Sequence, residues 1–192
     1  MHTLSASFIL GYHGCYRSVA DSLLNGADFA ASDNAYDWLG PGVYFWEANP
    51  KRGLSFIEEK SKRDAAPEDG AVVGAVIDLG LCLDVTSQSG VDQLRTAHAF
   101  FEKARREAGE PRPSNSGGPD RLLRQLDCAV IKTLHALREE QGKPPLDTVK
   151  GVFVEGAPIY DGAGVYEKTH IQICVRNPDC IKGVFRVPDR FL

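Results

Sequence analysis

The sequence predicts an α+β fold for three reasons. Short apolar runs typical of strands stand near both ends of the chain, and the longest helical patterns lie between them. Strand and helix signals do not alternate regularly, as they do in parallel βαβ folds, so we expect an antiparallel or mixed sheet. The length of 192 residues fits one domain, which we assign to residues 1–192, with a helical insertion over about residues 88–142.

The first part of the chain carries strand and helix signals in turn. Asn25-Gly26 closes the first helical pattern as a C-cap does, and Asn49-Pro50 places a cap and a proline where the second helix begins. The aromatic run after Gly42 is typical of a strand, and a later continuous apolar run is typical of a buried one. The expected elements are a strand at 7–12, a helix at 17–24, a loop at 31–38, a strand at 43–46, a helix at 50–62 with Leu54, Phe56 and Ile57 inward, and a strand at 71–79.

The second part of the chain combines the insertion with three further strands. Apolar positions at helical spacing flank a segment rich in proline, serine and glycine, which is typical of a surface loop. Beyond the insertion, short apolar runs separated by glycine-bearing and Asn-Pro breaks indicate strands. The expected elements are helices at about 91–108 and 120–141 around a loop at 109–119, and strands at 151–155, 170–176 and 180–187 with a loop at 157–169.

Charge and hydropathy exclude several classes of protein. The 22 Lys and Arg residues against 26 Asp and Glu residues give a net charge of -4, which excludes a nucleic-acid binder that relies on bulk positive charge. The basic residues of the inserted helices form either a local basic patch or a solvated face balanced by glutamates. No run reaches the about 18 apolar residues that a membrane span needs, and the start shows no signal peptide. We therefore expect a cytoplasmic protein without membrane contact.

The five cysteines stand at scattered positions and form no CxxC pair. Their odd count argues against a disulfide framework, and their spacing argues against a zinc site. We therefore expect reduced, partly buried thiols and no bound metal.

Two segments in the first part of the chain place ring side chains beside glycine. His13 and Gly14 stand at the end of the first expected strand, where the ring can donate or accept while the glycine backbone approaches a ligand. Taken alone, such a histidine is more often a structural residue. Tyr44 and Trp46 share one strand face and Phe45 the other, and this aromatic cluster fits either core packing or stacking on a planar ring.

A third segment places two polar side chains on one face of a strand. His170 and Gln172 share that face, while Ile171 and Ile173 share the other. If the polar face is buried, both side chains need hydrogen-bond partners. The alternative is a strand face exposed to solvent.

Taken in this order, the three segments resemble the ADP-ribosyltransferases of the diphtheria-toxin and poly(ADP-ribose) polymerase group, which carry a His, a Tyr and usually a Glu on three separate strands. Residues 12–14 are similar to the first motif, residues 40–45 to the second, and residues 170–173 fall where the third is expected. The segment 36–47 looks closest to small bacterial members, some of which are toxins of toxin–antitoxin pairs. The resemblance covers about half of the chain, implies a split β-sheet core, and leaves the insertion unexplained.

The resemblance implies NAD as substrate, cleaved between nicotinamide and ribose. His13 would hydrogen-bond the adenosine-side ribose, the Gly14 backbone would contact the nicotinamide carboxamide, and Tyr44 would stack on the nicotinamide ring. Phe56 is the candidate for a second aromatic wall, with Ser55 as the alternative, since the helix phase is open. Further candidates for the cofactor groove are Ser32, Asn34, Asp37 and Gly42. We expect His13, Tyr44 and Gln172 to converge on one dinucleotide.

Gln172 departs from the family pattern, because a carboxamide keeps the hydrogen bonds of a Glu but supplies no negative charge. Three outcomes stay open. The chain is a mono-ADP-ribosyltransferase acting on a good nucleophile, or it recruits a carboxylate from Glu155, Asp161 or Glu167, or it binds NAD without turnover. An NAD-binding module or weak NAD glycohydrolase is thus the alternative to a transferase. The third hypothesis is an unrelated α+β interaction domain. Polymer elongation is not expected.

The loop before the third motif is where the resemblance places acceptor recognition. Tyr160, Tyr166, Glu167 and His170 are the candidate contacts with a macromolecular acceptor, either protein or nucleic acid. A plain surface hairpin is the alternative. The similarity to toxins also implies an antitoxin as a possible partner.

Overall fold

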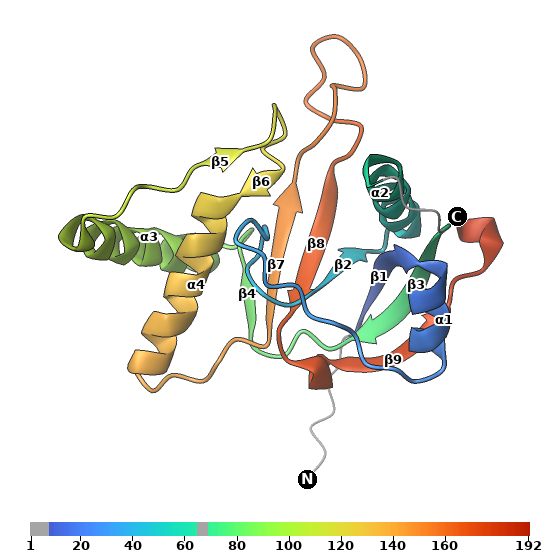
Figure 1. Cartoon of the computed structure of the whole chain (residues 1–192), viewed down its shortest axis with the longest axis horizontal. Coiled ribbons are helices and arrows are strands. Elements are labelled where there is room, and N and C mark those ends of the chain that lie inside the picture. Colours follow the sequence, from blue (N-terminus) through green and yellow to red (C-terminus); the bar gives the residue numbers. More distant parts are fainter. Residues whose placement is uncertain (1–7, 65–68) are drawn as a thin grey trace.

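A seven-stranded mixed sheet forms the centre of the computed structural model, which describes residues 8–64 and 69–192 (Figure 1). The strand order is β4-β7-β8-β2-β1-β3-β9. Neighbours in the sheet are antiparallel except β4 and β7, which are parallel, so the predicted α+β class with a mixed sheet is confirmed. The strands are β1 (Ile9–Tyr16), β2 (Val43–Glu47), β3 (Gly70–Ile77), β4 (Cys82–Asp84), β7 (Thr148–Phe153), β8 (His170–Val175) and β9 (Ile181–Arg186).

Four α-helices accompany the sheet in the described part of the chain. They are α1 (Arg17–Leu24), α2 (Pro50–Arg63), α3 (Gln88–Ala108) and α4 (Gln125–Glu140). The Asn49 side chain accepts the Arg52 N–H at 3.0 Å and caps α2 as predicted. Helix α3 ends at Gly109, whose φ of 68° is left-handed and favours glycine.

Several element boundaries differ from the sequence prediction. Helix α4 begins at Gln125 rather than near residue 120, because the preceding residues form a small hairpin of β5 (Asn115–Ser116) and β6 (Leu123–Arg124). Strand β4 was not predicted, and its three residues are too short for a periodic signal. Residue 7, placed in the first predicted strand, lies outside the described residues.

The first strand was predicted to stop at residue 12, and this was wrong. Strand β1 continues to Tyr16, because eight of its residues pair with β3. His13 and Gly14 therefore lie inside a strand and not at its end, and their side-chain directions alternate. His13 and Gly14 therefore lie on opposite faces of the sheet.

The two faces of the sheet carry different sets of residues and different helices. The face toward α2, called the α2 face below, carries Tyr12, Gly14, Tyr44, Trp46, His170 and Gln172. The opposite face, called the α1 face, carries His13, Phe45, Val73 and Ile173. The prediction that Tyr44 and Trp46 point one way and Phe45 the other is confirmed.

Apolar clusters bury both faces. On the α1 face, α1 packs Ala20 and Leu23 over Val73, and Phe45 lies in a second cluster with Ile173. On the α2 face, α3 and α4 pack beside β4 and β7 at one end of the sheet, while α2 covers β1 and β3 at the other (Figure 1). The helical insertion thus covers the β4–β7 end of the α2 face.

The cysteines and helices meet two further expectations from the sequence. All five cysteines are free thiols; Cys82 is half-buried and the other four are buried. Within the described ranges, no helix is both long and apolar enough to cross a membrane.

Strands β1 and β2 run together only briefly. Their register contains two pairs, Gly11 with Glu47 and Tyr12 with Trp46, whereas β1 stays paired with β3 along its whole length. The two strands therefore part after Tyr12, at the position of His13 and Gly14. Helix α2 approaches closely there: a Cβ at Gly14 would lie 2.1 Å from the carbonyl oxygen of Gly53. Only a residue without a side chain allows this contact.

We predict that Gly14→Ala destabilises the protein by about 1–3 kcal/mol, because the added methyl must push α2 away from β1. Gly183→Ala is the matched control, since Gly183 also lies in a strand but has no atom within 4 Å of a built Cβ. It should stay within about 0.5 kcal/mol of the wild type. Urea unfolding measures both variants, and an equal effect of the two would refute the close approach.

Candidate functional site

His13 and Tyr44, the first two predicted site residues, are joined through the backbone of β2. His13 Nδ1 lies 2.8 Å from the carbonyl oxygen of Tyr44, so this nitrogen carries the proton and donates. The ring packs edge-on against Phe29 and next to Phe45 on the α1 face. Burial lowers the pKa of His13, and the hydrogen bond to Tyr44 offsets part of that effect. The ring is therefore neutral at pH 7, with a lone pair on Nε2.

Tyr44 lies on the α2 face with its hydroxyl held by the loop before β2. The hydroxyl donates to the Gly40 carbonyl at 2.6 Å and accepts the Leu39 N–H at 2.9 Å. Burial raises the pKa of Tyr44 well above its ordinary value, so the phenol stays protonated. The hydroxyl is thus used to shape the loop, and the partly buried ring packs against the apolar cluster on this face.

Gln172 is buried on the α2 face, opposite Trp46 on the neighbouring strand. Among the described residues its carboxamide makes no hydrogen bond. The predicted alternative of an exposed polar strand face is wrong, because His170 and Gln172 are both buried. Tyr44 and Gln172 share one face, while His13 projects from the other, so the three side chains do not converge directly as expected. The link between the two faces is the His13–Tyr44 hydrogen bond.

The other predicted groove residues have structural partners. Ser32 Oγ donates to Asp37 at 2.8 Å, and the same carboxylate accepts the Asn34 N–H at 2.7 Å, so these residues hold their own loop together. A Cβ at Gly42 would lie 2.5 Å from Cys174 Sγ, so this glycine permits close packing on β8. The polar side chains of Ser32, Asn34 and Asp37 are thus engaged with one another, and Gly42 has no side chain to offer a ligand.

Phe56 and Ser55 differ from their predicted orientation. Phe56 was expected to face inward, yet it is 38% exposed, and its ring contacts Trp46 at 4.9 Å rather than Tyr44. Ile57 is the buried residue of this turn. Ser55 Oγ donates to the Lys51 carbonyl within the helix. Phe56 therefore forms the outer side of an aromatic pair with Trp46.

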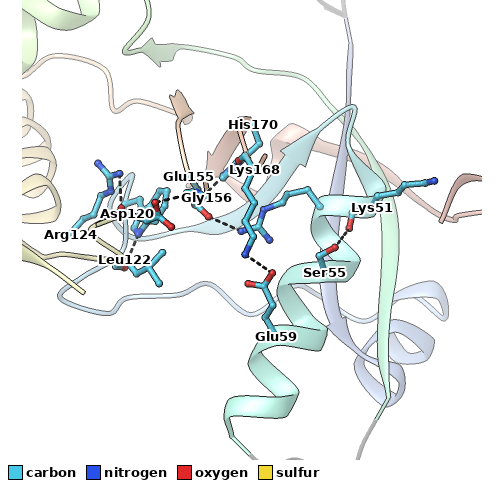
Figure 2. Close-up of polar contacts among 12 residues, drawn as sticks. Lys51, Ser55, Glu59, Asp120, Leu122, Arg124, Glu155, Gly156, Lys168 and His170 are labelled. Carbon is cyan, nitrogen blue, oxygen red and sulfur yellow. Dashed lines mark hydrogen bonds and ion pairs between the residues drawn. The ribbon is translucent and has the colours of Figure 1, made fainter. Parts of the chain in front are cut away.

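A buried polar centre lies beside this aromatic pair, because Arg52 and His170 both lie next to the Trp46 ring. Figure 2 shows Glu155 and His170 of this centre. Arg52 Nη2 lies 2.8 Å from Glu155 Oε2, and the two side chains are only 10% and 4% exposed. The other carboxylate oxygen, Oε1, faces His170 Nε2 at 3.8 Å. The first turn of α2, the end of β7 and the start of β8 thus meet at three ionisable groups. Buried charges of this kind persist only when paired.

His170 is enclosed by aromatic rings. The rings of Trp38, Trp46 and Phe153 lie between 5.8 and 6.4 Å from its own, centre to centre. Nδ1 donates to the Lys168 carbonyl at 2.6 Å, so the lone pair of the neutral ring is on Nε2 and points toward Glu155. Burial lowers the pKa of His170, and Lys168 and Glu155 oppose that shift.

The insertion contributes directly to this centre. The Arg124 guanidinium lies 4.3 Å from the Trp38 ring centre and 5.2 Å from that of Phe153, in cation–π geometry. Trp38 Nε1 donates to the Leu122 carbonyl at 2.9 Å, and Asp120 accepts the N–H of Gly156 (Figure 2). The β5–β6 hairpin is therefore docked onto the loop before β2 and the end of β7.

Most other basic residues of the inserted helices are paired with acids. Glu102 binds Arg105 and Arg112, which holds its pKa at about 2, and Lys132 binds Asp33 at 2.7 Å. These pairs favour the solvated, balanced face over a basic patch for nucleic acid.

Five nitrogen atoms of the polar centre, Arg124 included, have unmet hydrogen bonds. Among the described residues, Trp46 Nε1, Arg52 Nε and Nη1, Arg124 Nε and His170 Nε2 are shut off from solvent without a hydrogen-bond partner. Buried polar groups are nearly always satisfied by protein or by ordered water, so this cluster is a candidate place for water or for a ligand.

The predicted acceptor residues separate into two groups. Tyr160 is 65% exposed, Glu167 is exposed and Tyr166 half-exposed, all on the hairpin that projects between β7 and β8 (Figure 1). The His170 side chain is 0% exposed, so it belongs to the buried centre and not to the hairpin surface. The acceptor candidates are therefore reduced to the three hairpin residues.

Sequence reasoning missed Arg52, Trp38 and Arg124. The Asn49 cap fixes Arg52 in the first turn of α2, and this position was a readable signal that a charged side chain faces the sheet end. Trp38 and Arg124 carried no such signal, because they are 86 residues apart in sequence and meet only through the docked hairpin.

No protein-family model, no curated protein and no solved structure matches this chain. Within residues 8–64 and 69–192, no group of three or more His, Cys, Asp or Glu residues is placed to hold a metal ion. The function is therefore inferred from the chemistry of the site itself.

We predict that Arg52→Met costs about 3–5 kcal/mol of stability, because it leaves the Glu155 carboxylate buried and unpaired. The double variant Arg52→Met/Glu155→Leu should recover most of that loss, and urea unfolding gives the double-mutant cycle. Lys168→Met is the control: its pair with Glu59 is 38% and 50% exposed and should contribute at most about 1 kcal/mol. A double variant as unstable as Arg52→Met would argue against the ion pair.

A second prediction concerns the acid side of the stability profile. Burial, with Arg176 and Arg138 nearby, lowers the pKa of His135 from 6.5 to about 4, and both ring nitrogens lack hydrogen-bond partners in the part of the chain that the structure describes. Between those two values the unfolded chain binds a proton that the folded protein does not, so stability falls as the pH drops. His135→Phe should lose less stability than the wild type between pH 7 and pH 5. Equal losses in urea unfolding would contradict this origin.

Proposed function

We propose that the protein is a mono-ADP-ribosyltransferase that cleaves NAD between nicotinamide and ribose and transfers ADP-ribose to a macromolecular acceptor. The observation that carries the proposal is the hydrogen bond from His13 to the Tyr44 carbonyl. It joins the two segments with the strongest family resemblance, at the point where β1 and β2 part and α2 closes over Gly14. Within the continuous seven-stranded sheet, the short pairing between β1 and β2 is the feature that supports a split core of the kind that the resemblance implies.

The residues around this division offer groups that suit a dinucleotide. No described residue occupies His13 Nε2, which can accept from a ribose hydroxyl. The Tyr44 ring is fixed by its hydroxyl and can stack on the nicotinamide. Holding a substrate between rigid groups lowers the activation barrier, because the substrate has already lost its translational and rotational freedom before the reaction starts. Ser32, Asn34, Asp37 and Gly42 are assigned to the support of this site, since their groups hold the loop.

Cleavage of the glycosidic bond generates an oxocarbenium-like ribosyl carbon, which a negative charge stabilises. Gln172 can orient the ribose hydroxyls but cannot supply that charge. This favours transfer of a single ADP-ribose to a good nucleophile over polymer elongation, because a hydroxyl acceptor needs activation by a base.

The acceptor is proposed to meet the projecting β7–β8 hairpin through Tyr160, Tyr166 and Glu167. The paired basic residues of the insertion give nucleic acid little to bind, so a protein acceptor is favoured. A toxin role with an antitoxin partner rests on family analogy alone. Growth arrest on expression in a bacterial host would support the toxin role. Normal growth of a host that expresses the active enzyme would exclude it.

We predict that the purified protein releases nicotinamide from NAD and transfers label to a component of a cell lysate, and that NAD raises its melting temperature by mass action. Tyr44→Ala should abolish release and label transfer, because the stacking ring is lost. Tyr36→Ala, a change at a tyrosine that is 42% exposed, is the matched control. A melting shift without release identifies an NAD-binding module, and the absence of both effects refutes the proposal.

A further inference from the structure

The carboxylate that Gln172 lacks has one structural candidate. Of the three acids near the third motif, Asp161 and Glu167 are exposed on the hairpin, and the Glu167 carboxylate accepts the Ala157 N–H at 3.3 Å. Glu155 is 4% exposed and lies among residues of the α2 face. All three acids are near Gln172 in sequence, but only Glu155 is buried on the same face of the sheet as Gln172.

Building on the proposed function, we propose that Glu155, held by Arg52 beside His170, supplies the negative charge that stabilises the ribosyl cation during NAD cleavage. Gln172 then orients the ribose without carrying charge. In the family pattern a single glutamate has both roles. Here Gln172 orients the ribose and Glu155 supplies the charge.

The register of the sheet supports this assignment. Phe153 pairs with His170 and Gly151 pairs with Gln172, so the two polar residues of β8 follow one another along one face. Glu155 continues the same side of the chain beyond β7, with Oε1 3.8 Å from His170 Nε2 (Figure 2). Gln172 is flanked by Trp46 on β2 and by Gly151 on β7, where Val85 and Leu39 pack closely over the glycine.

The unmet hydrogen bonds point to a ligand at the same place. Within residues 8–64 and 69–192, Trp46 Nε1 and the Arg52 Nε and Nη1 groups are buried donors without acceptors, and Trp46 is only 3% exposed. A ribose and a carboxamide both carry oxygen acceptors that satisfy such donors. Phe56, 38% exposed and packed on Trp46, is the side chain that a ligand displaces to reach them.

The charge balance of the reaction explains why a nearby carboxylate matters. The electron pair of the breaking C–N bond leaves with nicotinamide, which becomes neutral. The positive charge remains on the ribosyl carbon until an acceptor nucleophile bonds there and releases its proton to solvent. A fixed negative charge near that carbon lowers the barrier, because its interaction is strongest where water is excluded.

The test compares nicotinamide release in four proteins. Arg52→Gln/Glu155→Gln removes both charges together, so that neither is left buried alone. We expect it to fold and to show the NAD-induced melting shift, with release lowered about 100-fold. Adding Gln172→Glu to this variant should restore release. The matched control, Glu47→Gln/Lys150→Gln, removes the ion pair at 2.8 Å on the α1 face and should leave release unchanged.

The outcomes separate this inference from the proposed function. A folded double variant with wild-type release overturns the role of Glu155 but leaves the transferase intact. A wild type that neither binds nor cleaves NAD overturns both. If Arg52→Gln/Glu155→Gln does not fold, Arg52→Met/Glu155→Leu takes its place, because it also removes both charges and replaces them with apolar side chains. Release lowered to a similar extent in this variant supports the assignment, and wild-type release overturns it.

Discussion

The ion pair between Arg52 and Glu155 is the interaction on which the site depends. Both groups are almost fully buried, and a buried charge without its partner is strongly unfavourable. The pair therefore fixes the first turn of α2 against the end of β7. His170 is held next to the pair by the Lys168 carbonyl and by the neighbouring rings of Trp38, Trp46 and Phe153. The arrangement leaves donors without acceptors, which a purely structural core rarely does.

Strand alternation imposes a second constraint, because neighbouring residues of a strand point to opposite faces. His13 faces the α1 side, while Tyr44 and Gln172 face the α2 side. A ligand that uses all three has to lie where β1 and β2 part, where the His13 ring already crosses to the Tyr44 backbone. The polar centre around Glu155 lies on the α2 side of that point.

The helical insertion is part of the site and not an accessory to it. Helices α3 and α4 bury one end of the α2 face, and the β5–β6 hairpin brings Arg124 over Trp38 and Phe153. These contacts fix the loop that precedes β2, and this loop in turn holds the Tyr44 hydroxyl. Stability in the insertion and geometry at Tyr44 are thus coupled through packed side chains.

The sequence alone determined the α+β class, the helix caps, the loop before β2 and the alternation of Tyr44, Phe45 and Trp46, because these follow from local patterns of period and capping. It also identified His170 and Gln172 as neighbours on one strand face. Only the tertiary structure decided that β1 continues past His13 and that Arg52 and Glu155 meet. Register and long-range pairing depend on contacts between segments far apart in the chain, and no local pattern encodes them.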